Sequence, residues 1–358
     1  VETAGRRQGH HGRVTETDML RIAVIGAGWA GCRQVEAVRE LASDVSVVAL
    51  VDTDLDHVEA KAGEYDIGRA VLDYRDVLDA ADVDAVSICT PHATHHPIAI
   101  DAAEAGKHVL VEKPMALNVD QATEMIDAAE ANDVKLYVAA SVTYSAESKF
   151  LREAVRSGDL IGDVTGASLS RGFRAPEFGY PGRRAWLTRP EDGGTGTWML
   201  HGIHNIAQLR YIFGEVRTVY MREHATASFR RPDIEATMAG LLTMRTGVNI
   251  SVHQTCETRL PRAMDGYCIY GEHGVLRASS AGCEFIPEDG APQPVEYEPE
   301  PLSEFAQEIQ AFGDYVAGAS VGPTTGYSER RTLAIVQAGY ESARTGAPVE
   351  LDERFGPI

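Results

Sequence analysis

Short runs of β-branched residues alternate with helical patterns through the first 145 residues of this sequence. Strand-like apolar runs occupy residues 21–25, 45–51, 85–88, 108–111 and 136–139. Between them, apolar residues recur at helical spacing over residues 31–41, 54–64, 96–105 and 119–131. This alternation is typical of β-α-β units, in which right-handed crossovers join parallel strands. The sequence therefore predicts an α/β domain with a doubly wound sheet of roughly five parallel strands.

The pattern changes to a period of two beyond residue 146. After a helix expected over residues 146–157, polar and apolar residues alternate over 165–171, 218–223, 236–244, 248–254 and 267–270. Strands that follow one another with turns between them pair antiparallel. Further helices are expected over 197–213, 303–316 and 328–344, and an acidic loop with several prolines over 287–301. We expect a second, α+β domain built on a large, mostly antiparallel sheet.

Length and composition agree with two globular domains. The 358 residues can bury two cores, and 44% of them are apolar and 24% charged. We expect a disordered or extended tail over residues 1–19, a first domain over 20–145 and a second over 146–358, whose last helices can pack back on the first. No run reaches the ~18 uncharged apolar residues of a membrane helix, so we expect no membrane partner. The formal charge of −20 disfavours nucleic acid, which proteins bind through Lys and Arg.

The cysteines and the tail favour a cytoplasmic location. The five cysteines form no C-x-x-C pair, which predicts free thiols in a reducing compartment and no cysteine metal site. The tail carries three arginines but lacks the apolar segment of a secretory signal.

A glycine-rich turn follows the first predicted strand directly and opens the first helix. With 34 glycines among 358 residues, chance alone supplies about 0.3 G-x-G-x-x-G motifs, so the position of this one carries the information. After a strand, the first glycine makes the tight turn, the second lets a pyrophosphate approach the backbone, and the third lets helix pack on strand. We therefore expect a Rossmann dinucleotide site with the phosphates at Gly26, Ala27, Gly28, Trp29, Ala30 and Gly31. A purely structural glycine turn is the alternative.

A carboxylate ends the second predicted strand. Asp52 comes 21 residues after Gly31, where it can accept hydrogen bonds from both ribose hydroxyls of a dinucleotide and repel a 2′-phosphate. No Lys or Arg follows before Lys61. We therefore expect the cofactor NAD rather than NADP, with Asp52 and its neighbour Thr53 at the adenosine ribose. Asp52 can also cap the helix that follows, which is compatible with this role.

Two motifs further along resemble those of a known enzyme family. Residues 89–95 are Cys-Thr-Pro-His-Ala-Thr-His, and residues 105–114 end in Glu-Lys-Pro after a strand. With the segment 329–351, they resemble the glucose-fructose oxidoreductase and inositol dehydrogenase family, Gfo/Idh/MocA. The resemblance implies a Rossmann domain, a substrate domain used for oligomerisation, and hydride transfer to or from a carbon bearing a sugar or cyclitol hydroxyl. We expect a homodimer or homotetramer through the C-terminal sheet.

The resemblance also implies cofactor contacts beyond the glycine turn. They are Thr90, Pro91, His92, His95, Glu112 and Lys113. Lys113 lies at the carboxyl end of a parallel strand, the edge where open α/β sheets bind ligands. Its ammonium can therefore lie between the nicotinamide and a substrate hydroxyl and stabilise a forming alkoxide. A solvated lysine paired with Glu112 is the alternative, and His95 can also simply begin a helix.

The family's third motif is an Asp followed four residues later by a proton-transferring His, on a helix behind a glycine-rich loop. Here Gly193 and Gly194 begin the loop and His204 matches that His, but Leu200 stands in place of the Asp. A carboxylate four residues before a His can raise its pKa or fix its tautomer, and that support is absent. His201 can join His204 in relaying the proton or make structural hydrogen bonds. We expect no metal, because no Asp, Glu or Cys lies at ligand spacing around the two histidines.

The residues expected to contact substrate lie at the sheet edge after the last predicted strand of the first domain, and before or on that helix. They are Tyr144, Arg174, Trp186, His201 and Asn205. Trp186 offers a stacking face to a ring. Arginines precede the helix in an otherwise acidic chain, at Arg171, Arg174, Arg183, Arg184 and Arg189. They can meet an anionic substrate or the pyrophosphate, or they can form a solvated loop.

Three functions follow from these features. The first is an NAD-dependent dehydrogenase acting on a CH–OH group of a sugar, glycoside or cyclitol, in which His204 takes the hydroxyl proton and Lys113 polarises the oxygen. The second keeps the NAD bound and recycles it, using transient oxidation to cleave a glycosidic or other bond. The third is an NAD-binding sensor that catalyses nothing.

Overall fold

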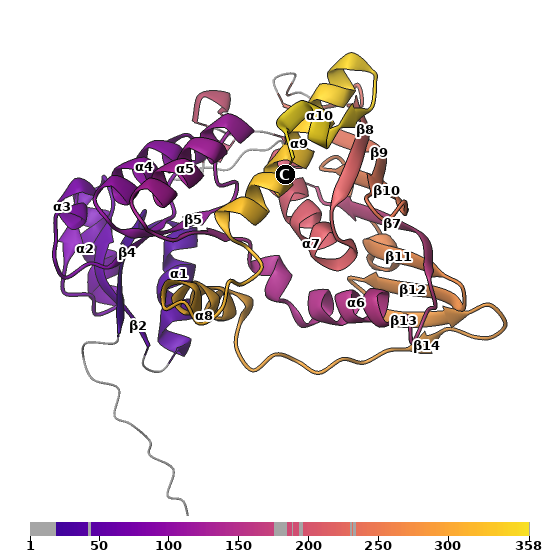
Figure 1. The fold of residues 1–358 in the computed structure, drawn as a ribbon, viewed down its shortest axis with the longest axis horizontal. Helices are drawn as coiled ribbons and strands as arrows, with labels where there is room; N and C mark the ends of the chain where they lie inside the picture. Colours follow the sequence, from indigo (N-terminus) through magenta and orange to yellow (C-terminus); the bar gives the residue numbers. More distant parts are fainter. Residues whose placement is uncertain are drawn as a thin grey trace, which may run out of the picture.

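The structure, a computed structural model, describes residues 19–41, 44–174, 185–187, 189–192, 196–229, 231 and 234–357. The expected tail falls almost wholly outside these residues, as do Arg183, Arg184, Gly193 and Gly194. Figure 1 shows two bodies side by side, a sheet between helices on the left and a longer sheet covered on its inner face by helices on the right.

The first sheet has the strand order β3-β2-β1-β4-β5-β6, and its pairs are parallel. Its strands are β1 (Leu20–Ile25), β2 (Val45–Val51), β3 (Ala70–Val71), β4 (Ala85–Ile88), β5 (His108–Glu112) and β6 (Leu136–Ala139). The five predicted strands are present, and β3 has only two residues, too few to show a period. The order reverses between β1 and β4, so the ligand crevice of such a fold lies at their carboxyl ends.

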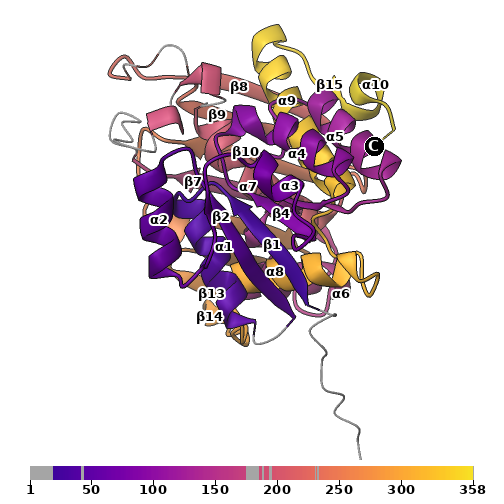
Figure 2. The ribbon, with the colours of Figure 1, turned by 90° about the vertical axis from the view of Figure 1, so that its left-hand side faces the viewer.

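Helices cover both faces of this sheet (Figures 1 and 2). They are α1 (Trp29–Glu40), α2 (Leu55–Glu64), α3 (Arg75–Leu78), α4 (His95–Glu104) and α5 (Val119–Ala131). Consecutive residues of β1 belong to different buried clusters: Ile22 packs with α1 and the later helix α8 (Glu304–Val316), whereas Ala23 belongs to the cluster of α4 and α5. Burial on both faces explains why these strands are continuously apolar.

The second sheet has nine strands in the order β14-β13-β12-β11-β7-β10-β9-β8-β15. They are β7 (Val164–Gly172), β8 (Val216–His224), β9 (Thr237–Met244), β10 (Asn249–Thr255), β11 (Gly266–Gly271), β12 (Gly274–Ser279), β13 (Gly282–Pro287), β14 (Gln293–Pro294) and β15 (Val349–Glu350). Among the paired strands described, β7 and β10 run parallel and the others antiparallel, which confirms a mostly antiparallel sheet. The sequence did not indicate β12 to β15, and β14 lies within the expected acidic loop.

Three helices lie against the inner face of this sheet: α6 (Ala146–Ser157), α7 (Ile203–Phe213) and α9 (Gly326–Thr345) (Figure 1). α8 instead joins the first domain, where the Phe312 ring lies 6.1 Å from that of Tyr137. The short α10 (Leu351–Phe355) ends the chain.

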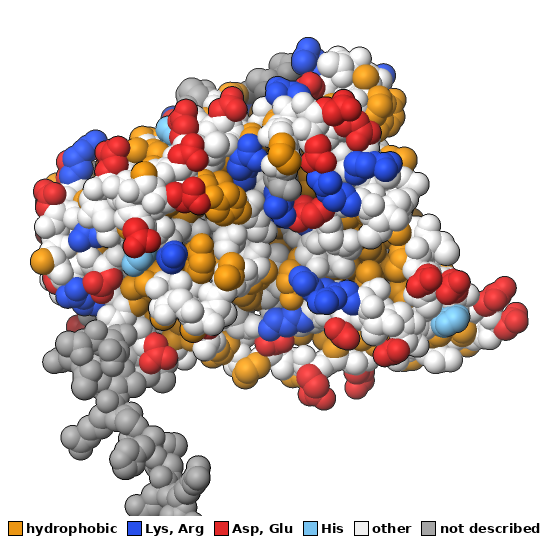
Figure 3. Space-filling model, in the orientation of Figure 1, with side chains coloured by type: hydrophobic (Ala, Val, Ile, Leu, Met, Phe, Trp, Pro, Cys, Tyr) orange, Lys and Arg blue, Asp and Glu red, His pale blue; other side chains and the backbone are white. Residues whose placement is uncertain are grey.

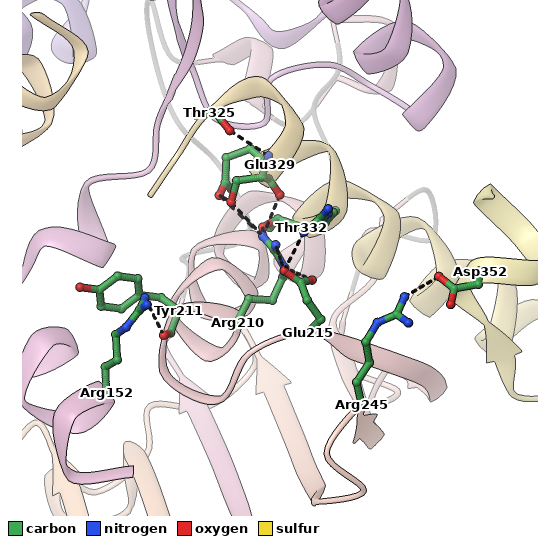
Figure 4. Close-up of polar contacts among 11 residues, drawn as sticks. Arg152, Arg210, Tyr211, Glu215, Arg245, Thr325, Glu329, Thr332 and Asp352 are labelled. Atoms are coloured by element: carbon green, nitrogen blue, oxygen red, sulfur yellow. Dashed lines mark hydrogen bonds and ion pairs between the residues drawn. The ribbon is translucent and has the colours of Figure 1, made fainter. Parts of the chain in front are cut away.

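Basic side chains gather around the middle of the face drawn in Figure 3. A cavity of about 480 Å³ lies between α6, α7 and α9, with Arg152 and the buried Arg210 in its lining. Figure 4 shows what these side chains do: Arg210 binds Glu215 at 2.7 Å and lies 3.8 Å from Glu329, while Arg152 stacks on the ring of Tyr211. The network therefore ties the end of α7 to the start of α9.

Candidate active site

The glycine turn between β1 and α1 is shaped by close backbone contacts. Gly26 has φ +103°, and a Cβ there would lie 2.5 Å from the Cys89 carbonyl oxygen. A Cβ on Gly31 would lie 1.9 Å from the Gly26 carbonyl oxygen. Around Gly28, in contrast, nothing lies within 4 Å of such a Cβ, and no side chain among the described residues caps α1. The turn thus leaves space for an anion to approach the backbone beside Gly28, at the start of α1.

Asp52 ends β2 against this turn. Its side chain is buried, and its two carboxylate oxygens accept hydrogen bonds from the Ala27 amide at 3.0 Å and the Asp54 amide at 3.2 Å. Asp54, rather than Asp52, caps α2 by accepting from the His57 amide. The His57 ring also lies 2.8 Å from the Ala27 carbonyl oxygen, a contact that the sequence did not indicate.

His95 links the loops that follow β4 and β5. Its two ring nitrogens lie 2.8 Å from the Pro114 carbonyl oxygen and 2.9 Å from that of Thr90. Burial lowers the pKa of His95. The buried His92 ring lies between His95 and Trp186, with its centroid 4.6 Å from the indole. His95 is also the first residue of α4, so it both begins a helix and joins the loops.

Lys113 comes directly after β5 and reaches across to the second domain. Its Nζ donates a hydrogen bond to the Leu200 carbonyl oxygen at 3.2 Å. Burial raises the pKa of the neighbouring Glu112, whose carboxylate accepts from the Gln34 amide at 3.3 Å. The same amide binds Glu308 of α8 at 3.2 Å. Glu112 is therefore bound to Gln34 inside the protein, while the charge of Lys113 still acts on it and opposes the rise in its pKa.

Lys113, His201 and His204 come together at the start of the α7 helix. Burial, the Lys113 ammonium and His201 together hold the pKa of His204 well below its usual value. The His201 ring lies 4.2 Å from that of Phe173. This end of the helix is a π-helical turn, Trp198–Gly202, where the sequence predicted a regular helix.

Leu200, at the position of the expected Asp, is buried in an apolar cluster. Its other members are Phe173, Trp186, Leu187, Phe229, Ile234, Ala236 and Cys256. The side chain at position 200 therefore packs into the second domain, and no carboxylate from this position assists His204.

Two predicted substrate residues have their polar groups engaged elsewhere. The Tyr144 hydroxyl is buried, 2.7 Å from that of Tyr137 and 3.4 Å from that of Thr324. The Asn205 amide donates to Gln254 at 2.6 Å. The Tyr144 hydroxyl is therefore bound within the protein, and a role of this side chain in substrate binding stays a prediction.

The described arginines are bound within the protein or exposed, and Arg171 lies in β7 rather than in a loop. Arg171 donates to the Asp265 carbonyl oxygen, and Arg189 pairs with Asp192 at 2.6 Å. Arg174 is exposed. Within the described ranges, no group of three or more His, Cys, Asp or Glu is arranged to hold a metal ion. Nor does any helix in the part of the chain covered by the structure have the length and apolarity to cross a membrane.

A parallel sheet of this order, an open glycine turn at its switch point and a lysine facing the second domain define a two-domain dinucleotide-binding oxidoreductase. Residues 20–140 match the model of the oxidoreductase family with an NAD-binding Rossmann fold, and residues 149–277 match the GFO/IDH/MocA C-terminal domain. The chain belongs to the Gfo/Idh/MocA family of oxidoreductases.

Full-length relatives support this assignment. The chain is 27% identical over 342 residues to 1,5-anhydro-D-fructose reductase of Ensifer adhaerens, covering 93% of this chain and 99% of that one. It is 25% identical over 345 residues to inositol 2-dehydrogenase 3 of Saccharopolyspora erythraea, covering 94% and 97%. The fold is similar to that of aldose-aldose oxidoreductase from Caulobacter crescentus in complex with glycerol, at a TM-score of 0.83, 24% identity and coverage of 93% and 99%.

Proposed function

We propose that this oxidoreductase is an NAD-dependent dehydrogenase that transfers hydride between the nicotinamide and a hydroxyl-bearing carbon of a sugar, glycoside or cyclitol. The observation that carries the proposal is the joining of Lys113, at the carboxyl edge of the first sheet, to the helix that bears His204. Two similar proteins are named for activities on an anhydrosugar and an inositol, which fits this substrate class.

The glycine turn and Asp52 fit NAD. The open backbone at Gly28 and the uncapped start of α1 suit a pyrophosphate, and the Asp52 carboxylate is already fixed beside the turn. In this arrangement a 2′-phosphate would meet a negative charge, so we assign NAD rather than NADP. The bound nicotinamide would accept or supply the hydride.

His204 is the proton acceptor in this proposal. Its low pKa keeps the imidazole neutral near pH 7, which is the form that takes a proton from a hydroxyl. Lys113 is the electrostatic partner, because an ammonium beside the hydroxyl oxygen stabilises the charge that forms there. His201 is one helical turn from His204 and supplies a second site for the departing proton.

A product assay tests the proposal. Purified protein is incubated with NAD and a panel of aldoses, inositols and glycosides, and both NADH and carbohydrate products are quantified. Stoichiometric NADH with a keto product supports the dehydrogenase. Bond cleavage without net NADH would instead support the retained-NAD reaction, and tight NAD binding with neither product would support a sensor.

We also propose that two or more copies assemble through the outer face of the second sheet. Tyr220 of β8 and Leu241 of β9 lie opposite each other, and both side chains are exposed. Tyr270 of β11 is exposed as well. An open, partly apolar sheet face of this kind suits a second copy of the same surface. Light scattering of the wild type and of a Leu241→Glu variant tests this; a monomeric wild type would contradict it.

A further inference from the structure

The π-helical turn Trp198–Gly202 and α7 form one continuous helix, and the first amides of this helix have no acceptors inside it. Four consecutive N–H groups, those of residues 196–199, lie at this start, where helices leave their donors unsatisfied. All four are bound by just two residues from other elements. Gly196 N and Trp198 N donate to the Glu235 carboxylate at 3.0 and 2.7 Å, Thr197 N donates to the Glu235 carbonyl oxygen at 3.2 Å, and Met199 N donates to the Tyr340 hydroxyl at 3.1 Å.

Glu235 and Tyr340 also bind each other. Glu235 lies just before β9 with 6% of its surface exposed, and Tyr340 on α9 donates its hydroxyl hydrogen to the same carboxylate at 2.8 Å. A negative charge at a helix N-terminus is stabilised by the helix dipole. A Cβ on Gly196 would lie 2.4 Å from a carboxylate oxygen, so position 196 admits only glycine while Glu235 keeps this place.

The Trp198 side chain fixes the same turn from another side. Its indole N–H donates to the Val336 carbonyl oxygen on α9 at 3.0 Å, and its ring is fully buried. The ring packs against Gly202 and Gly339, where a Cβ would lie 2.8 and 2.6 Å from ring atoms. The turn therefore has little freedom to slide along α9.

The next peptide group connects this clamp to the proposed chemistry. Leu200 N donates to the Gly196 carbonyl oxygen at 3.2 Å, and the Leu200 carbonyl oxygen accepts from Lys113 at 3.2 Å. A displacement of residue 196 would therefore also displace the carbonyl group that holds Lys113. His204 lies one helical turn beyond that carbonyl group. Since position 200 carries no carboxylate, the orientation of this turn depends on groups outside the helix.

We infer that Glu235, together with Tyr340, is a positioning residue for catalysis: it clamps the first turn of the helix and so sets the place of Lys113 relative to His204. The inference rests on the proposed function. Glu235 touches no reacting atom; it acts through the backbone of residues 196–200.

The test compares Glu235→Gln and Tyr340→Phe with the control Glu329→Gln. Glu329 is a carboxylate of similar burial, 5% exposed, that binds the far end of α7 through Arg210 (Figure 4). The side-chain amide introduced by Glu235→Gln turns a donor toward at least one helix amide, which breaks the clamp without changing side-chain size. Displacement of a catalytic group by about 1 Å costs about 100-fold in rate, so we expect kcat to fall by about that factor with the KM for NAD little changed.

A second readout needs no substrate. The imidazole signal of His204, assigned by its loss in His204→Asn, is titrated by NMR in each variant. We expect the midpoint to shift in Glu235→Gln, to shift less in Tyr340→Phe, and to stay at the wild-type value in Glu329→Gln. Equal titrations and equal kcat in Glu235→Gln and Glu329→Gln would overturn the inference. If the wild type oxidises nothing in the panel, the proposed function fails, while the His204 titration still decides the positioning role; if Glu235→Gln does not fold, Tyr340→Phe decides it.

Discussion

Replacing Asp52 by Asn should weaken NADH binding and reduce the preference over NADPH. The carboxylate is 8% exposed and held by the Ala27 and Asp54 amides, so Asn fills the same space but loses the charge and one of these two acceptors. A hydrogen bond to a charged acceptor contributes about 1.5–3 kcal/mol. Losing one such bond to the ribose raises the Kd for NADH about 10- to 150-fold. The Kd for NADPH should rise less or fall, because the repulsion of the 2′-phosphate is removed.

Fluorescence titration with NADH and NADPH measures both constants. The matched control is Asp54→Asn, which neutralises an adjacent, exposed carboxylate that caps α2. The control should keep the wild-type ratio of the two constants. The ribose assignment would be refuted if Asp52→Asn left that ratio unchanged, or if Asp54→Asn changed it equally.

Three further predictions concern buried ionisable side chains. His204→Asn should lower kcat by about 100-fold or more and keep the affinity for NADH within a few fold. Because the pKa of His204 lies well below 6.5, the rate of oxidation by the wild type should stay level as the pH falls to 6.5. A decline of that rate centred at pH 6.5 would contradict the role of His204 as proton acceptor. Arg210→Met should cost about 3–5 kcal/mol of unfolding free energy in urea, because it leaves the buried Glu329 without its ion pair, while Glu215 keeps the one with Arg331. A loss below about 1 kcal/mol would contradict the network in Figure 4. Burial and the charge of Glu112 raise the pKa of Glu308 well above 4.5, so the native chain retains a proton that the unfolded chain releases. The free energy of unfolding should therefore decline as the pH rises above 4.5, and Glu308→Gln should lessen that decline. The same decline in the variant and the wild type would contradict the raised pKa of Glu308.

The local elements were predictable because their signals are local. Strands of the first sheet are buried on both faces, so they appear in the sequence as unbroken apolar runs. The glycine turn could be recognised because it directly follows one of these runs. β3 was not predicted because two residues are too few to show a period. The π-helical turn at Trp198–Gly202 was not predicted because its sequence is compatible with a regular α-helix.

Through-space contacts were less accessible. Glu235 and Trp198 stand 37 positions apart, and Tyr340 and Met199 stand 141 apart, so no motif links them. Tyr144 shows the converse: its position after a strand of the first sheet suggested the crevice, yet its hydroxyl bonds within the domain packing. The family resemblance assigned Lys113 and His204 to one reaction, but the hydrogen bond from Lys113 to the Leu200 carbonyl oxygen shows only in the folded chain.

Deuterium transfer from substrate to the nicotinamide distinguishes a dehydrogenase from a protein that only binds the cofactor. The protein is incubated with NAD and a substrate from the panel that carries deuterium on each hydroxyl-bearing carbon, and the nicotinamide is analysed by mass spectrometry, including any fraction retained on the protein. We expect deuterated NADH with the wild type and its loss in Lys113→Met and His204→Asn. Unlabelled nicotinamide in every reaction, with cofactor bound and the labelled compounds unchanged, would contradict it.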